Sequence, residues 1–231
     1  MNHLHAEQAF EELAKRLSDP VELASYKRLH AAYSPGLLPL LFGLLLVQGG
    51  NLVYGKKPSY LKFRAIEVIA RVPYHSWEAV GFVFMTLFYS DEQKALKLAK
   101  TADFARIAQD NETMHVVAIS ALAQQEQQTG IIRSTLLPLC FAFFYFWSSA
   151  ILYLLCKRWS FELNYVFEEH AFEQYQLFLD LHSEELKKKK VHSKFLTWYG
   201  RQPKNQYEFF VSVRNDELIH RNHSIEAIQE K

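Results

Sequence analysis

Apolar side chains recur at intervals of three and four residues along most of this chain, which is the spacing of amphipathic helices. The pattern predicts six helices, over residues 37–54, 59–90, 90–130, 136–156, 160–190 and 206–229. Pro73 should kink the second one, because a proline inside a helix removes a hydrogen bond and clashes with the preceding turn. With 8 glycines and 7 prolines in 231 residues, turn residues are too few for a fold of many strands. No linker divides the chain, so we predict a single all-α domain over residues 1–231.

Two of the predicted helices, residues 37–54 and 136–156, are almost wholly apolar. The second lies between Arg133 and Lys157 and is long and apolar enough to cross a bilayer.

The N-terminal segment is predicted to be an amphipathic helix that precedes the apolar ones. Its glutamates and its lack of an apolar core argue against a secretory signal or a transit peptide.

Charge and cysteine content narrow the functional classes. The 26 basic and 25 acidic residues give a formal net charge of +1, which provides no long-range field to attract nucleic acid. Cys140 and Cys156 lie in an apolar run without metal-ligand spacing. We therefore predict two buried, inert thiols in a reducing compartment and no nucleic-acid partner.

The motif Glu-x-x-His occurs twice, as Glu112 with His115 and as Glu217 with His220. A spacing of three places both side chains on one helix face, where they can offer an oxygen and a nitrogen to one metal ion. A single such pair is more simply interpreted as two exposed polar residues. Both pairs, however, interrupt apolar stripes, and a buried carboxylate is costly unless it is paired or bound to metal. The repeated pattern therefore favours metal binding.

Two further glutamates, Glu67 and Glu168, interrupt similar apolar stripes. Four carboxylates and two imidazoles on four helices are the ligand set of the ferritin-like di-iron bundles. Hard oxygen ligands with one imidazole per metal suit iron, or manganese, better than an ion that prefers thiolates. Asn111 and Asp216 each precede a ligand glutamate and are candidates for orienting the ligands through hydrogen bonds. We predict a ferritin-like four-helix bundle that holds two iron ions and carries two additional apolar helices.

Four segments resemble the signature motifs of the alternative oxidases, in the family's order: EVIARVPY (67–74), NETMH (111–115), FEEHAFEQY (167–175) and RNDELIH (214–220). The ARVPY and EHA sequences are most similar to the plastid-type branch, which oxidises plastoquinol. The resemblance covers about residues 30–225. It implies that the irons are held by the residues already selected, which are Glu67, Glu112, His115, Glu168, Glu217 and His220. It also makes Tyr175 the candidate redox-active tyrosine.

The resemblance further implies a quinol site beside the first ligand helix and after the third ligand. The corresponding residues of this sequence are Lys62, Ile66, Ala171 and Gln174. The family usually has Arg at the position of Lys62 and Thr at that of Gln174. The hydrogen bonds to the quinol head group should therefore differ in this chain.

The implied activity is that of a membrane-bound quinol:oxygen oxidoreductase. Such an enzyme reduces dioxygen to water with electrons from ubiquinol or plastoquinol, is insensitive to cyanide and pumps no protons. The resemblance also implies a homodimer. Two alternatives stay open: a di-iron hydroxylase or desaturase acting on a lipid-soluble substrate, and a ferritin-like iron-handling membrane protein.

A shared metal site restricts how the two apolar helices can be oriented in a membrane. If residues 136–156 crossed the bilayer, Glu112 and Glu168 would lie on opposite sides of about 30 Å of hydrocarbon and could not share a site. We therefore expect both apolar helices to lie along the interface, as monotopic helices with basic residues at head-group level. The alternative is a buried hairpin without lipid contact. The expected location is the cytoplasmic face of a bacterial inner membrane, or an organellar membrane.

Overall fold

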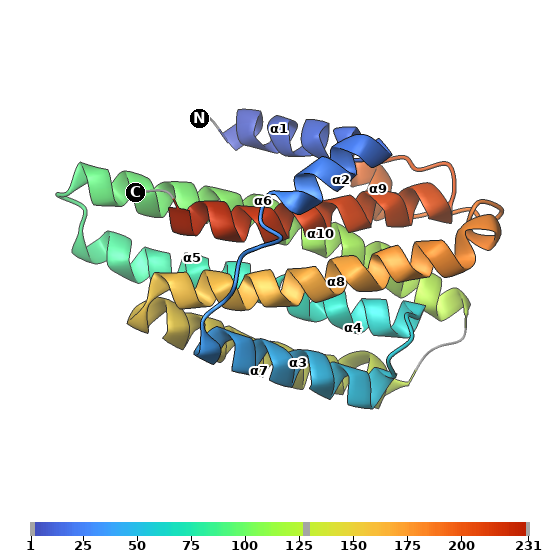
Figure 1. Ribbon diagram of the computed structural model, residues 1–231, viewed down its shortest axis with the longest axis horizontal. Coiled ribbons are helices and arrows are strands. Elements are labelled where there is room, and N and C mark those ends of the chain that lie inside the picture. The colour runs from blue at the N-terminus through green and yellow to red at the C-terminus, as the bar shows by residue number, and fades with distance from the viewer. Residues whose placement is uncertain (1–2, 127–129, 230–231) are drawn as a thin grey trace.

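The computed structural model describes residues 3–126 and 130–229, which form a bundle of helices lying roughly along one direction (Figure 1). Within these ranges the backbone forms helices and turns but no strand. The elements are α1 (His3–Arg16), α2 (Pro20–Arg28), α3 (Leu37–Tyr54), α4 (Tyr60–Ala70), α5 (Val72–Leu87), α6 (Glu92–Gln125), the π-helical turn η1 (Ile132–Leu136), α7 (Leu137–Leu155), α8 (Lys157–Leu186), α9 (Lys194–Tyr199) and α10 (Gln206–Gln229). The prediction of an all-α fold is confirmed.

The region predicted as one kinked helix over residues 59–90 contains two helices, because the helix breaks at Arg71. α4 begins after Ser59, whose hydroxyl accepts a hydrogen bond from the backbone N of Lys62 at 3.2 Å. Pro73 lies in the first turn of α5, where the N–H that proline lacks would have no partner within the helix. The prediction of a single helix is therefore wrong, since the proline starts a new helix and does not bend a continuous one.

The other helix boundaries follow local capping. α6 begins after Asp91, whose carboxylate accepts from the backbone N of Lys94 at 3.1 Å. It ends at Gln125, so the predicted stop at Gly130 is too late, and residues 127–129 lie outside the described part of the chain. The sequence pattern did not predict α2 and α9, which have 9 and 6 residues and are too short for an apolar repeat to stand out.

Four helical units enclose the centre of the bundle. α10 packs along α8, while the consecutive helices α4 and α5 pack along α6. Aromatic rings fill the space between these units. Phe63 of α4 stacks on Tyr175 of α8 with ring centroids 4.2 Å apart, and its ring lies 5.7 Å from that of Phe210 in α10. These contacts hold the helices close enough for side chains from all of them to meet in the middle.

The apolar helices α3 and α7 lie side by side along one edge of the bundle, the lower edge in Figure 1, whereas α1 and α2 lie along the opposite edge. α3 packs on α8, and α7 packs on α5 and α8. Gly43 allows the close approach of α3, because a Cβ at this position would lie 2.5 Å from Cγ1 of Val166.

The outer faces of α3 and α7 are apolar and exposed. Both segments, Leu37–Tyr54 and Ile132–Leu155, are long and apolar enough to cross a membrane, but only 17% and 33% of them is buried in the bundle. The prediction of two buried cysteines is wrong, because Cys140 is exposed on α7 and Cys156 is half-buried. A helix that is apolar on every face gives no periodic signal for which side packs inward.

Candidate metal centre

Six ionisable side chains from four helical units meet at the centre of the bundle. They are Glu67 of α4, Glu112 and His115 of α6, Glu168 of α8, and Glu217 and His220 of α10. Each of the six has an exposed fraction of 0%. The structure thus brings together every residue that the sequence analysis selected as a metal ligand.

The donor atoms form two overlapping groups. One group contains Glu67 and His115, the other contains Glu168 and His220, and Glu112 and Glu217 belong to both. Within each group, one donor atom from each residue lies within 4.8 Å of the others. Four carboxylates and two imidazoles divided in this way are the donor set of the two-metal carboxylate bundles.

Some of these donor atoms form hydrogen bonds within the cluster and others form none. His115 Nδ1 is hydrogen-bonded to Glu67 Oε2 at 3.0 Å and lies 3.4 Å from Glu217 Oε1. His220 Nδ1 lies 2.8 Å from Glu112 Oε1, but without the alignment of a hydrogen bond. Both carboxylate oxygens of Glu112 and Glu217 and both ring nitrogens of His220 are buried without a hydrogen bond. Because buried polar atoms are normally hydrogen-bonded, these oxygens and nitrogens fit bound cations.

Burial and mutual repulsion oppose full ionisation of this cluster. Burial raises the pKa of Glu217 well above its usual value, and the charges of Glu112 and Glu67 add to the rise. Burial raises the pKa of Glu168 to about 7, again with a contribution from Glu112. Positive metal ions would favour the ionised carboxylates, so the electrostatics of the cluster also fit a cation site.

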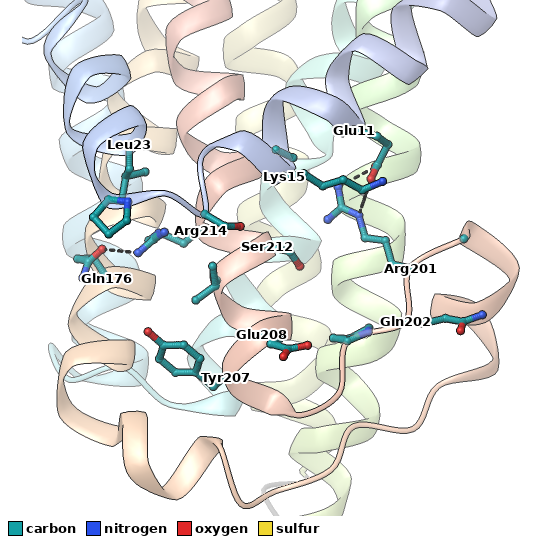
Figure 2. Close-up of a pocket in the computed structure, with 16 residues that line it drawn as sticks. Glu11, Lys15, Leu23, Gln176, Arg201, Gln202, Tyr207, Glu208, Ser212 and Arg214 are labelled. Atoms are coloured by element: carbon teal, nitrogen blue, oxygen red, sulfur yellow. Dashed lines mark hydrogen bonds and ion pairs between the residues drawn. The ribbon is translucent and has the colours of Figure 1, made fainter.

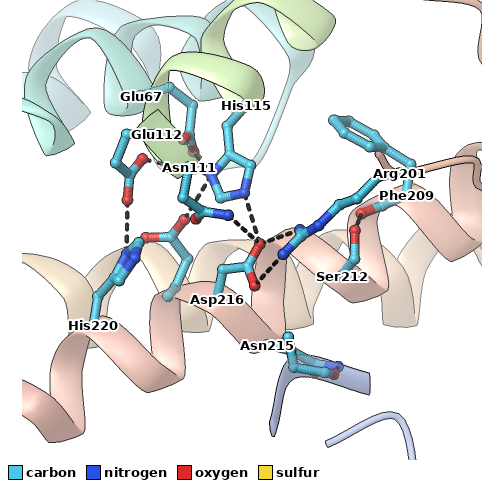
Figure 3. A network of polar contacts seen from close by, with 12 residues as sticks. Glu67, Asn111, Glu112, His115, Arg201, Phe209, Ser212, Asn215, Asp216 and His220 are labelled. Carbon is cyan, nitrogen blue, oxygen red and sulfur yellow. Dashed lines mark hydrogen bonds and ion pairs between the residues drawn. The ribbon is translucent and has the colours of Figure 1, made fainter. Parts of the chain in front are cut away.

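A chain of polar contacts fixes the outer side of His115 (Figure 3). His115 Nε2 lies 2.9 Å from Asp216 Oδ2, and Asn111 Nδ2 donates to the same oxygen at 3.2 Å. Arg201, from the loop before α10, donates from Nη2 to Asp216 Oδ1 at 3.0 Å and from Nη1 to Asp216 Oδ2. Burial alone would raise the pKa of Asp216, but Arg201 and His115 lower it to about 2. The anchored Nε2 leaves Nδ1 of His115 facing the carboxylates.

Two buried tyrosines each bind a glutamate of the cluster. Tyr175 donates to Glu67 Oε1, and Tyr74 donates to Glu168 Oε1 at 2.9 Å. Each tyrosine follows a glutamate by seven residues, Glu67 before Tyr74 and Glu168 before Tyr175, and contacts the glutamate of the other pair. The sequence analysis selected Tyr175 only through the family resemblance and missed Tyr74. The repeated spacing of seven is a signal that could have identified it.

The residues selected for a quinol site lie on α4 and α8. Lys62, one turn before Ile66, donates from Nζ to Gln174 Oε1 and to Asn51 Oδ1, both at 2.8 Å. Its side chain is buried, and burial lowers its pKa to about 8. Ile66 and Ala171 are also buried. The structure therefore joins Lys62 directly to Gln174 across the two helices.

Comparison with known proteins gives two matches. The family model named alternative oxidase matches residues 41–227 of this chain. The chain is also similar to a protein of Arabidopsis thaliana named ubiquinol oxidase 4, chloroplastic/chromoplastic, with 26% identity over 182 residues. These residues are 70% of this chain and 49% of that relative, so the chain spans about half of the relative's length. No solved structure matches. All six clustered ligand candidates lie inside the family match, whereas α1 and α2 precede it.

Proposed function

The chain belongs to the alternative oxidase family, and from this premise we propose that it is a quinol oxidase, which reduces dioxygen to water with electrons from a quinol. The observation that carries the proposal is the meeting of four carboxylates and two imidazoles, all fully buried, in two overlapping ligand groups. The family is one of di-iron enzymes, and this donor set suits two iron ions. The resemblance inferred from four short motifs is confirmed at the level of the family.

In this proposal the two overlapping groups would hold the two iron ions. Glu67 and His115 would serve one ion, Glu168 and His220 would serve the other, and Glu112 and Glu217 could serve either. When bound, iron supplies the one-electron and dioxygen chemistry that side chains lack. The protein excludes water from the centre, holds the carboxylates together and, through Asn111 and Asp216, fixes the orientation of the His115 ring.

Tyr175 is the proposed redox-active side chain. Its hydroxyl is buried and donates to Glu67, and its ring stacks on Phe63. Burial and the neighbouring carboxylate charges raise the pKa of Tyr175 well above its ordinary value, so the proton stays on the hydroxyl at neutral pH. Glu67 is then the acceptor to which this proton can move when the ring is oxidised.

The quinol head group is proposed to bind between α4 and α8, at Lys62, Ile66, Ala171 and Gln174. Lys62 and Gln174 now bond to each other, and they can exchange this contact for bonds to the two quinol oxygens. Ile66 and Ala171 offer apolar contact to the ring. Lys62 and Gln174 are the sequence neighbours of Phe63 and Tyr175, whose rings stack, which supports a head-group site on the same two helices as the proposed redox-active tyrosine. Ubiquinol and plastoquinol both carry the two oxygens that such a site needs.

We propose that α3 and α7 lie in one leaflet of a membrane. Both run along the same edge of the bundle, and neither contains an acidic residue (Figure 1). A groove of about 560 Å³ between them has an apolar lining that includes Leu38, Phe143 and Trp147. Basic residues flank the two helices, at Lys56, Lys57, Arg133, Lys157 and Arg158. Lys62 also donates to Asn51 of α3, so the proposed head-group site borders a helix that would lie in the lipid, and a quinol could enter from that side.

We also propose a membrane, an oligomeric state and two properties of turnover for this protein. The membrane is an organellar membrane or the cytoplasmic face of a bacterial inner membrane, and the protein acts as a homodimer. Turnover is insensitive to cyanide and moves no protons across the membrane. The whole chain, residues 1–231, acts as one domain.

The test is oxygen uptake by the purified protein in detergent with a short-chain quinol, with and without cyanide. The proposal predicts uptake that continues in cyanide and disappears in Glu217→Ala. The matched control is Glu226→Ala, which lies on the same helix outside the ligand groups and should leave uptake unchanged. Protein that binds two irons but consumes no oxygen with quinol would refute the proposal and favour a hydroxylase or an iron-handling protein.

A further inference from the structure

The N-terminal helix α1 reaches the surroundings of both histidines of the metal centre. The ring of Phe10 packs against the ring of His220, with centroids 5.5 Å apart. The next residue, Glu11, accepts from Arg201 Nη2 at 2.7 Å and from Arg201 Nε at 3.2 Å. Arg201 in turn binds the Asp216 carboxylate that contacts His115 (Figure 3). Two consecutive residues that precede the family match therefore connect to the two halves of the site.

α1 is docked directly on the ligand helix α10. Its buried residues Phe10 and Ala14, with Leu17 just after the helix, pack against Ile219 of α10 and a residue of α6. In addition, Nδ2 of Asn215, the residue before Asp216, donates to the backbone carbonyl of Ala14 at 2.9 Å. The register of α1 on α10 is thus set by both packing and a hydrogen bond. This register places Glu11 opposite Arg201.

The Arg201 side chain is nine-tenths buried and is held by two carboxylates. A cavity of about 760 Å³ lies between α1 and the start of α10, and Figure 2 shows Glu11 and Arg201 joined at its wall. Glu11 binds one side of the guanidinium and Asp216 binds the other. A guanidinium held by two carboxylates has a fixed plane, because its donors form a rigid fork. Without Glu11, Arg201 could turn toward the cavity and loosen its bonds to Asp216.

We propose that Phe10 and Glu11 are positioning residues for the metal-binding histidines. Phe10 fixes the ring of His220 together with Tyr74, whose ring centroid is also 5.5 Å away, and Glu11 fixes the ring of His115 through Arg201 and Asp216. α1 is then a cap on the metal centre that this chain supplies from outside the family-matched region. The inference rests on the ligand set proposed above.

The expected change in the rate of iron release depends on how many noncovalent contacts separate each residue from the metal-binding histidine. Replacing a direct partner of a metal-bound histidine typically costs about 10- to 100-fold in metal affinity or activity. Arg201 and Glu11 act one and two contacts further out. We therefore expect about tenfold faster iron release for Arg201→Gln and about threefold faster release for Glu11→Gln, scaling down from that range. Phe10→Leu, which keeps an apolar side chain but loses the ring contact, should resemble Glu11→Gln.

The experiment loads the full-length protein with iron(II) without oxygen and follows transfer of the iron to an excess of chelator. The matched control is Glu12→Gln, which removes the same charge from an exposed position of α1. It should release iron at the unaltered rate. A second control, Leu186→Ala, creates a cavity at the far end of α8 and lowers the unfolding temperature without touching α1. Quinol oxidation should show a lower kcat for Glu11→Gln and an unchanged KM.

The outcomes separate this inference from the proposed function. Equal release rates for Glu11→Gln and Glu12→Gln would overturn the positioning role. So would faster release from Leu186→Ala in proportion to its lower unfolding temperature, since α1 would then act only through overall stability. If the unaltered protein bound no iron, the ligand assignment itself would fail. Faster release from Glu11→Gln in a protein that oxidises no quinol would uphold the positioning role and reject the oxidase function.

Discussion

Glu168→Gln should stabilise the iron-free protein at neutral pH and weaken its stabilisation by iron. Glutamine has nearly the shape of glutamate and keeps an oxygen that can accept from Tyr74, the hydroxyl donor to Glu168 Oε1. What it removes is a fully buried carboxyl whose pKa is raised to about 7, first by burial and then by the charge of Glu112. The substitution therefore tests two effects of this carboxyl separately: the loss of folding stability that it causes without metal, and the stabilisation that it provides as a metal ligand.

The magnitude follows from the pKa of Glu168 in the two states. A raised pKa means that the folded state holds the proton more tightly, so stability is full below pH 4.5 and is lost as the pH rises toward 7. Each pKa unit corresponds to about 1.4 kcal/mol, which gives a loss of about 3 kcal/mol at pH 7 and under about 1 kcal/mol at pH 5. In a chain of this size 1 kcal/mol shifts Tm by about 2–4 °C, so the variant should gain about 6–12 °C at pH 7.

The assay is thermal unfolding in detergent at pH 5, 6 and 7, with a chelator present and then with iron(II). Iron should raise the Tm of the unaltered protein more than that of the variant, because a ligand stabilises the state that binds it. Asp180→Asn, at an exposed position of the same helix, is the control and should change little. The reasoning is refuted if the iron-free variant is no more stable at pH 7, or if its advantage persists undiminished at pH 5.

Three further substitutions test other parts of the structure. Tyr175→Phe should lower kcat for oxygen uptake by about tenfold or more with iron content unchanged, as measured by metal analysis, and full activity would remove the redox role. Lys62→Met should raise the KM for quinol by about tenfold, since a hydrogen bond to a charged group contributes about 1.5–3 kcal/mol, and an unchanged KM would place the head group elsewhere. Gly43→Ala should lower stability by about 1–3 kcal/mol because its Cβ would lie 2.5 Å from Val166 Cγ1, and an unchanged Tm would contradict this close packing.

The metal-ligand candidates could be selected from sequence because buried charge is costly. Two Glu-x-x-His pairs interrupt apolar stripes, namely Glu112 with His115 and Glu217 with His220. On a solvent-exposed helix the charged residues would lie opposite the apolar stripe and not within it. Glu67 was harder to select, since a single glutamate in an apolar stripe indicates a metal ligand only when the other ligands are already known. All of these side chains meet in the structure, because each stripe faces the same core.

The supporting residues could not be selected because their contacts cross between distant segments. Arg201 lies in a loop, and its partners Glu11 and Asp216 are 190 and 15 residues away along the chain. No periodic pattern connects such positions. Tyr74 entered the sequence analysis only as the last residue of the segment 67–74, although its hydroxyl donates to Glu168. Cys140 was misplaced because an all-apolar helix does not reveal its outer face.

The junction between α7 and α8 fixes the orientation of the proposed membrane-contacting helix α7 relative to the bundle. α7 ends at Leu155 and α8 begins at Lys157, so Cys156 alone connects them, in an extended conformation. A connection of one residue is too short to let the two helices tilt independently. If α7 lies along a lipid surface, as proposed, the axis of the bundle would run parallel to that surface, about one helix diameter, roughly 10 Å, above it. Electrons from the proposed quinol would then cross this single layer of helices to the metal centre without a carrier protein.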